Sequence, residues 1–230
     1  MIFTFGSRRP CWQAGSARRK FTAMRLLGQE RERSERLLLN ILPPPIAERL
    51  KASGDAIAEH TDNVTVLFAD IVGFTPLSAN KTPQELVGLL NRIFSEFDVL
   101  VDAHGLEKIK TIGDASMAVS GLPDAQPDHT SGAARMALAR FEAIAWLVAE
   151  TGEPIALRIG LHSGPFVVGV IGRRKFAYDL WGGAVNTASC IESHGLPGKV
   201  HCTEATAILL GSEFQLLQRE TIDVKDKGRM

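Results

Sequence analysis

Apolar residues recur with two different spacings along this chain, and each spacing predicts a different kind of element. Residues 64–69 form a short apolar run rich in branched side chains, which is typical of a buried strand. Over residues 82–103 apolar positions recur every three or four residues, which predicts an amphipathic helix. Thr82 can cap this helix with Glu85 as its capping-box partner, and Gly105 ends it. The predicted core stripe consists of Leu86, Leu89, Leu90, Ile93, Phe94, Phe97 and Leu100.

The remaining elements follow from the same patterns. Side chains alternate around Gly113 and Asp114, which predicts a hairpin with the acid in its turn. The other predicted elements are a helix over 131–150, a strand pair over 155–162 and 166–171, a helix over 183–193, a short strand near Val200, a helix over 203–210 and a strand over 214–224. The order strand, helix, hairpin, helix, strand is typical of a ferredoxin-like α+β sandwich, in which helices flank a mostly antiparallel central sheet.

The first sixty residues do not share this pattern. Residues 1–20 contain several arginines, no acidic residue and no apolar period, which predicts a disordered basic tail. Residues 21–62 are expected to be a helical linker that the three prolines at 43–45 interrupt. Met24, Leu27, Leu38 and Ile41 form a weak apolar seam in it, so the linker either packs on the domain or forms a short parallel dimer stalk. The globular domain is expected over 63–230.

Composition limits the class of protein. With 230 residues, 45% of them apolar, the chain can bury one sizeable core. Lys plus Arg and Asp plus Glu both number 26, so charge gives no support for a nucleic acid as the partner. Cys11, Cys190 and Cys202 lack metal-ligand spacing and are odd in number, which favours a reducing, cytoplasmic location. No window approaches the ~20 apolar residues of a membrane span.

Two acidic residues stand where predicted strands end. Asp70 follows the strand 64–69 and precedes the turn Ile-Val-Gly-Phe-Thr, and Asp114 lies in the predicted hairpin turn. A carboxylate at a strand end, beside the backbone amides of a glycine turn, is suited to hold a divalent cation next to a polyphosphate. A single Asp in a turn is more often a capping side chain. The pair, however, predicts a two-metal site.

Eight phrases extend this pattern along most of the chain: FADIVGFT, EKIKTIGDA, SGLP, RIGLHSGP, VGVIG, YDLWG, VNTAS and ESHGLPGKV. Through them the chain closely resembles the class III nucleotidyl cyclase catalytic domain, which makes cyclic AMP or cyclic GMP. The resemblance implies a head-to-tail homodimer in which Asp70, the backbone carbonyl of Ile71 and Asp114 of one subunit bind two Mg²⁺ or Mn²⁺ ions. One ion would activate the ribose 3′-hydroxyl and the other would steady the departing pyrophosphate.

The same resemblance assigns the substrate contacts. Lys110 and Asp179 match the positions that contact the purine, and an ammonium beside a carboxylate suits the N1 acceptor and 6-amino donor of adenine. The expected substrate is therefore ATP. Phe74 and Thr75, in the first phrase, are expected to contact it as well. Asn186 matches the residue that orients the ribose, and Lys225 matches a lysine on the terminal phosphates.

Cys190 is the main departure from the family pattern. Four residues beyond Asn186 the family has an arginine that stabilises charge on the transferring α-phosphate, and a neutral thiol cannot replace a guanidinium group. Loss of such a group lowers the rate by about 10² to 10⁵. Ser116 also replaces a usual aromatic residue, and the last strand that such domains complete is expected to be truncated.

Three functions remain open at this point. The first is an adenylate cyclase whose rate is low because of Cys190. The second is a catalytically silent nucleotide-binding or dimerisation partner of another cyclase chain that supplies the arginine. The third is a diguanylate-forming enzyme on a similar sheet, which the absence of a Gly-Gly-Asp/Glu-Glu-Phe turn disfavours.

Overall fold

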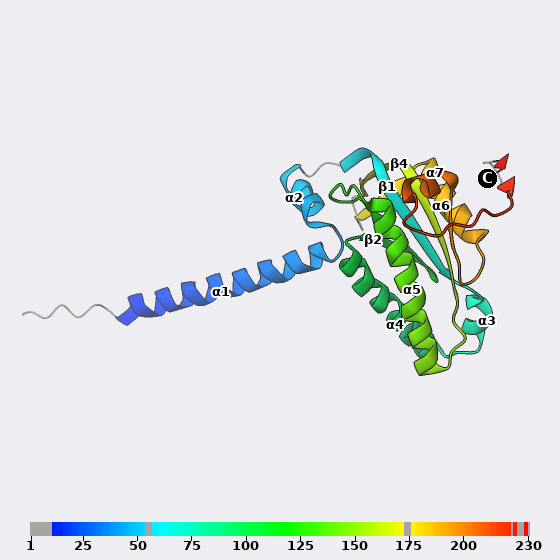
Figure 1. Cartoon of the computed structure of the whole chain (residues 1–230). Helices are drawn as coiled ribbons and strands as arrows, with labels where there is room; N and C mark the ends of the chain where they lie inside the picture. The colour runs from blue at the N-terminus through cyan, green and yellow to red at the C-terminus, as the bar shows by residue number, and fades with distance from the viewer. Residues whose placement is uncertain (1–10, 54–56, 173–175, 222, 225–227, 230) are drawn as a thin grey trace, which may run out of the picture. The chain divides into compact units, whose positions relative to one another are not determined.

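The chain divides into two units, residues 1–54 and 55–230, which are described separately. A computed structural model describes residues 11–53, 57–172, 176–221, 223–224 and 228–229 (Figure 1). Within these residues no helix combines the length and the apolar character that crossing a membrane requires.

The first unit consists of two helices. Helix α1 (Cys11–Leu39) begins inside the stretch 1–20, where the sequence pattern predicted a disordered tail, and residues 1–10 lie outside the described residues. The helix ends before the three prolines, and α2 (Pro44–Ser53) starts on one of them, because the first helical turn tolerates proline. An ion pair of 2.5 Å joins Lys51 of α2 to Glu35 of α1. Met24 and Leu27 are exposed, and the dimer stalk stays a prediction.

The second unit contains a six-stranded sheet with the strand order β2-β3-β1-β4-β5, and β6 pairs with β4. Its strands are β1 (Ile57–Ile71), β2 (Glu107–Ile112), β3 (Ala115–Ser120), β4 (Leu157–Ile171), β5 (Ala177–Trp181) and β6 (Val200–Cys202). All pairings are antiparallel except that of β6 with β4. The mixed α+β architecture with an antiparallel sheet is therefore confirmed.

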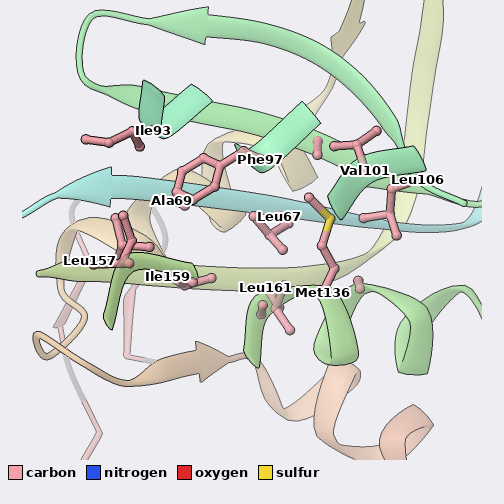
Figure 2. Close-up of a cluster of buried hydrophobic side chains, with 14 of the residues drawn as sticks. Leu67, Ala69, Ile93, Phe97, Val101, Leu106, Met136, Leu157, Ile159 and Leu161 are labelled. Carbon is pink, nitrogen blue, oxygen red and sulfur yellow. The ribbon is translucent and has the colours of Figure 1, made fainter. Parts of the chain in front are cut away.

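Helices cover both faces of this sheet. The unit's helices are α3 (Phe74–Ala79), α4 (Pro83–His104), α5 (His129–Thr151), α6 (Gly183–Ser193) and α7 (Glu204–Leu210). Helices α4 and α5 lie side by side on one face and bury a shared apolar core with β1 and β4 (Figures 1 and 2). In β4, Ile159 and Leu161 point into this core, so Gly160 points to the opposite face, where α6 packs.

Several local predictions are confirmed at the level of single residues. Thr82 accepts a hydrogen bond from the backbone N–H of Glu85, whose carboxylate accepts one from the backbone N–H of Thr82, so the capping box is present. Gly105 ends α4 with a left-handed backbone. The hairpin pairs Ile112 with Ala115, which leaves Gly113 and Asp114 in its turn.

Three boundaries differ from the sequence expectation. Strand β1 begins at Ile57 instead of residue 64, because its first half pairs with the far end of β4. The two strands expected over 155–171 form one continuous strand, since Ser163 and Gly164 still pair with β1. Residues 214–221 form no strand, and only β7 (Asp223–Val224) and β8 (Gly228–Arg229) pair in the described part of the carboxy-terminal segment.

Candidate active site

The two candidate metal ligands lie at one end of the sheet, one on strand β1 and the other in the turn that precedes β3. Asp70 is the penultimate residue of β1 and pairs with Ala115 of β3, and Asp114 directly precedes Ala115. Gly113 permits the tight turn because it adopts a positive φ of 64°. The charge of Asp114 acts on Asp70, so the two carboxylates form one electrostatic site.

Asp70 lies in an environment that disfavours its own charge. Burial is the largest cause, and the negative charges of Asp114 and Glu192 add to it, so the pKa of Asp70 rises from 3.8 to about 6. Arg158 opposes this rise without cancelling it. The local excess of negative charge is one that a divalent cation would neutralise, and carboxylate oxygens are its preferred ligands. The residues present therefore fit a metal ion.

Arg158 of β4 is a site residue that the sequence reasoning missed. Its guanidinium donates from Nη2 to Asp70 at 2.8 Å and from Nε to Glu192 at 2.8 Å. Glu192 is only 5% exposed and was likewise missed. A signal was present, because Arg158 is a charged residue inside a strand whose neighbours Leu157 and Ile159 are apolar. It places a positive group directly beside the acid pair.

The cation would need further oxygen ligands. Ile71 ends β1 with a buried side chain, so only its backbone can contribute. Over the residues that the structure describes, no three His, Cys, Asp or Glu side chains are grouped to hold a metal ion. Water or the oxygen atoms of a bound substrate would complete the coordination. Phe74 and Thr75 follow closely as the first residues of α3.

Lys110 and Asp179 form an ion pair, although they come from β2 and β5 at opposite ends of the strand order. The ammonium Nζ donates to Oδ2 of Asp179, and Oδ1 accepts from the backbone N–H of Leu180. The structure therefore brings together the two residues expected to contact the purine. The carboxylate keeps a fixed orientation because both of its oxygens have donors.

Helix α6 presents its candidate residues away from this chain's own acid pair. Glu192 faces the sheet, where it accepts from Arg158. Successive helical residues rotate by about 100°, so Cys190 projects to nearly the opposite side from Glu192. Asn186 lies one turn before Cys190 and shares its face; it is exposed, and Cys190 is a half-buried free thiol. Lys225 lies outside the described residues.

The comparisons with known proteins agree with this geometry. Residues 56–230 match the family described as the adenylate and guanylate cyclase catalytic domain. The chain belongs to this family. This chain is 48% identical over 202 residues to an adenylate cyclase of Mycobacterium tuberculosis. The match covers 87% of this chain and 46% of that protein. The chain thus spans about half the length of this relative.

Relatives on the guanylate side are also similar to the cyclase domain. A receptor-type guanylate cyclase of Caenorhabditis elegans is 43% identical over 203 residues, which cover 86% of this chain and 16% of that protein. Among solved structures, the catalytic core of a rhodopsin-guanylyl cyclase with converted specificity, in complex with ATPαS, has a TM-score of 0.72 and 38% identity. That match covers 75% of this chain and 94% of the other. Overall similarity therefore shows the family, but it does not distinguish an adenine nucleotide from a guanine nucleotide as the substrate.

Proposed function

We propose that this cyclase domain converts ATP to 3′,5′-cyclic AMP and pyrophosphate at the interface of a homodimer. The observation that carries the proposal is the orientation of α6. The helix turns Glu192 toward the chain's own Asp70 through Arg158 and turns Asn186 and Cys190 away from it. Residues that face away from one acid pair are free to serve the acid pair of a second subunit. A head-to-tail dimer would then contain two equivalent sites.

In each site one subunit would hold the cations. Asp70, Asp114 and the backbone carbonyl of Ile71 would bind two Mg²⁺ or Mn²⁺ ions, which supply activation of the 3′-hydroxyl and neutralise charge on the phosphates. Arg158 already donates to Asp70. With Asp70 engaged as a metal ligand, the Nη2 donor of Arg158 would be available to a phosphate oxygen, for which its planar donors are suited, while its Nε would stay bonded to Glu192. Phe74 and Thr75 lie at the start of α3, next to this position.

The other subunit would contact the nucleoside. Lys110 can donate to N1 of adenine, and Asp179 can accept from the 6-amino group. Guanine presents the reverse pattern, so neither group would find its partner on that base, and a mismatch of this kind discriminates by up to roughly 10⁴. The ion pair supports ATP as the substrate because it holds both side chains in place before the base binds. Asn186 would orient the ribose, and Lys225 would contact the terminal phosphates.

Cys190 predicts a slow enzyme. It occupies the position at which the family places a transition-state arginine, and its thiol is a weak donor without a charge. Restoring the arginine should raise the rate by about 10² or more. The test is an assay of cyclic AMP formed from Mn²⁺-ATP by the parental protein and by Cys190→Arg, with Cys202→Arg as a matched control at the second half-buried thiol.

The expected result is weak turnover in the parental protein, a large gain in Cys190→Arg and none in Cys202→Arg. GTP replaces ATP in a parallel series and should give little product. Fast turnover by the parental protein would contradict the role assigned to position 190. A folded, dimeric Cys190→Arg protein that makes no cyclic nucleotide would contradict the assignment of an adenylate cyclase.

A second candidate function follows from the same cysteine. The chain retains its acid pair, so in a heterodimer it could supply the cations while another cyclase chain supplies the arginine. Mixing with a Cys190→Arg, Asp70→Asn double variant tests this, because that variant has the arginine and lacks an intact acid pair. Turnover that appears only in the mixture supports the partner function. A mixture no faster than its components argues against it.

A further inference from the structure

Helix α5 carries a positive charge into the core that the proposed mechanism does not use. Arg140 is 1% exposed. Its Nη1 donates to Ser116 Oγ at 2.9 Å, and its Cζ lies 4.4 Å from the centroid of the Phe97 ring. Its Nε has no hydrogen-bond partner among the described residues. Burial lowers the pKa of Arg140 to about 9, so the group is still charged at neutral pH.

Such a residue is unfavourable for stability. No carboxylate forms an ion pair with Arg140 in the described part of the chain, and the acid that acts on its pKa, Asp98, already pairs with Lys108 at 2.5 Å. A buried charge without a close partner destabilises a fold, and an apolar side chain of similar volume is often more stable. The contact with Phe97 offsets this in part. We therefore expect an unbranched apolar residue to fill this place at an equal or lower free energy.

The acceptor of its hydrogen bond lies directly behind the acid pair. Ser116 of β3 pairs with Ala69 of β1 on one side and with Thr111 of β2 on the other. The residue that precedes Ser116 in β3, Ala115, pairs with Asp70, and Asp114 comes just before Ala115. Ala69 belongs to the core that α4 and α5 cover, so Asp70 points to the opposite face. Arg140 therefore bonds to β3 on the core face of the sheet. Asp70 lies on the opposite face, one residue further along β1 than the partner of Ser116.

We propose that Arg140 is a positioning residue for the cation site. Its bond to Ser116 fixes the start of β3 against β1, and so sets the separation between the carboxylates of Asp70 and Asp114. The guanidinium itself does not touch a cation or a substrate. Its effect passes through one hydroxyl and the backbone of β3. The inference rests on the proposed function, because it requires that the acid pair binds a divalent cation.

The test compares cation affinity with stability in the full chain. Mn²⁺ is titrated by calorimetry into the protein in the presence of 3′-deoxy-ATP, which lacks the attacking hydroxyl. Arg140→Met should raise the dissociation constant for Mn²⁺ about tenfold, as loss of a supporting contact does at other metal sites. Its denaturation midpoint should be equal to or higher than that of the parental protein, because a buried charge is removed. A merely structural role predicts no change in cation affinity.

Two further variants complete the design. Ser116→Ala removes the acceptor and should weaken Mn²⁺ binding in the same direction. Arg135→Met is the control on the same helix, since Arg135 is exposed and pairs with Asp128 and Glu213 away from the site. It should bind Mn²⁺ like the parental protein. If Arg140→Met fails to fold, the affinity of Ser116→Ala decides the question.

The outcomes separate this inference from the proposed function. A parental protein that binds Mn²⁺ through Asp70, combined with unchanged affinity in Ser116→Ala and in folded Arg140→Met, overturns the positioning role alone. A folded parental protein that binds Mn²⁺ no better than Asp70→Asn overturns both. Weaker binding in both Arg140→Met and Ser116→Ala, with normal binding in Arg135→Met, supports the inference.

Discussion

Replacing Asp70 by Asn should stabilise the metal-free protein. The fold raises the pKa of Asp70 from 3.8 to about 6, which means that its charge is unfavourable in the folded state. Without solvent screening, this rise in the pKa of Asp70 corresponds to a destabilisation of the folded state by about 3 kcal/mol. The side chain is 18% exposed, and solvent screening reduces the expected gain to roughly 1.5 kcal/mol. The amide oxygen of Asn can still accept the hydrogen bond from Arg158, so that contact is kept.

The gain in stability of Asp70→Asn should be largest at high pH and should disappear as the pH falls. Above pH 6 the carboxylate is charged in both states, so the full advantage of Asp70→Asn is present. As the pH falls, the folded protein binds the proton first, and the advantage disappears between about pH 6 and pH 4. Urea denaturation at pH 8 and at pH 4.5 measures both values. Asp62→Asn is the control, because Asp62 lies on the same strand and is 72% exposed.

Cations add a second readout to the same pair of proteins. Saturating Mn²⁺ should raise the free energy of unfolding of the parental protein and have little effect on Asp70→Asn, because a ligand stabilises only the state that binds it. The reasoning is refuted if Asp70→Asn is less stable than the parental protein at pH 8. An advantage that stays constant down to pH 4.5 would refute it equally.

Three further predictions concern the base, the position of α6 and a helix cap. Lys110→Glu should weaken binding of an ATP analogue relative to a GTP analogue by about tenfold or more in calorimetry, and an unchanged ratio would remove this lysine from the purine site. Gly160→Ala should destabilise the protein by roughly 1–3 kcal/mol in urea denaturation, because its methyl group would lie 2.4 Å from the backbone nitrogen of Glu192. Gly88→Ala is its control, with no atom within 4 Å, and should stabilise α4; equal effects would contradict the close packing of α6. Thr82→Ala should lower the free energy of unfolding by about 1 kcal/mol through loss of the capping box, and an unchanged denaturation midpoint would contradict this.

Local sequence patterns predicted the parts of the fold that local physics determines. The capping box at Thr82, the glycine that ends α4 and the turn at Asp114 each depend on residues a few positions apart. The boundaries that were wrong depend on distant partners. Strand β1 begins at Ile57 because β4 is long enough to pair with it. Residues 214–221 have a strand-like composition and, in the described part of the chain, no strand to pair with.

The candidate site divides in the same way. Sequence alone predicted the acid pair, because each acid lies at the end of a predicted strand beside a glycine turn. The resemblance to the cyclase family predicted the lysine and aspartate for the purine and the cysteine in place of the arginine, because each lies in a short phrase that matches the family. Only the tertiary structure decided that Arg158 links Asp70 to Glu192, that α6 turns Cys190 away from them, and that Arg140 supports β3 through Ser116. These contacts join residues between 24 and 88 positions apart, and burial and charge act through space, so no local pattern along the chain contains them.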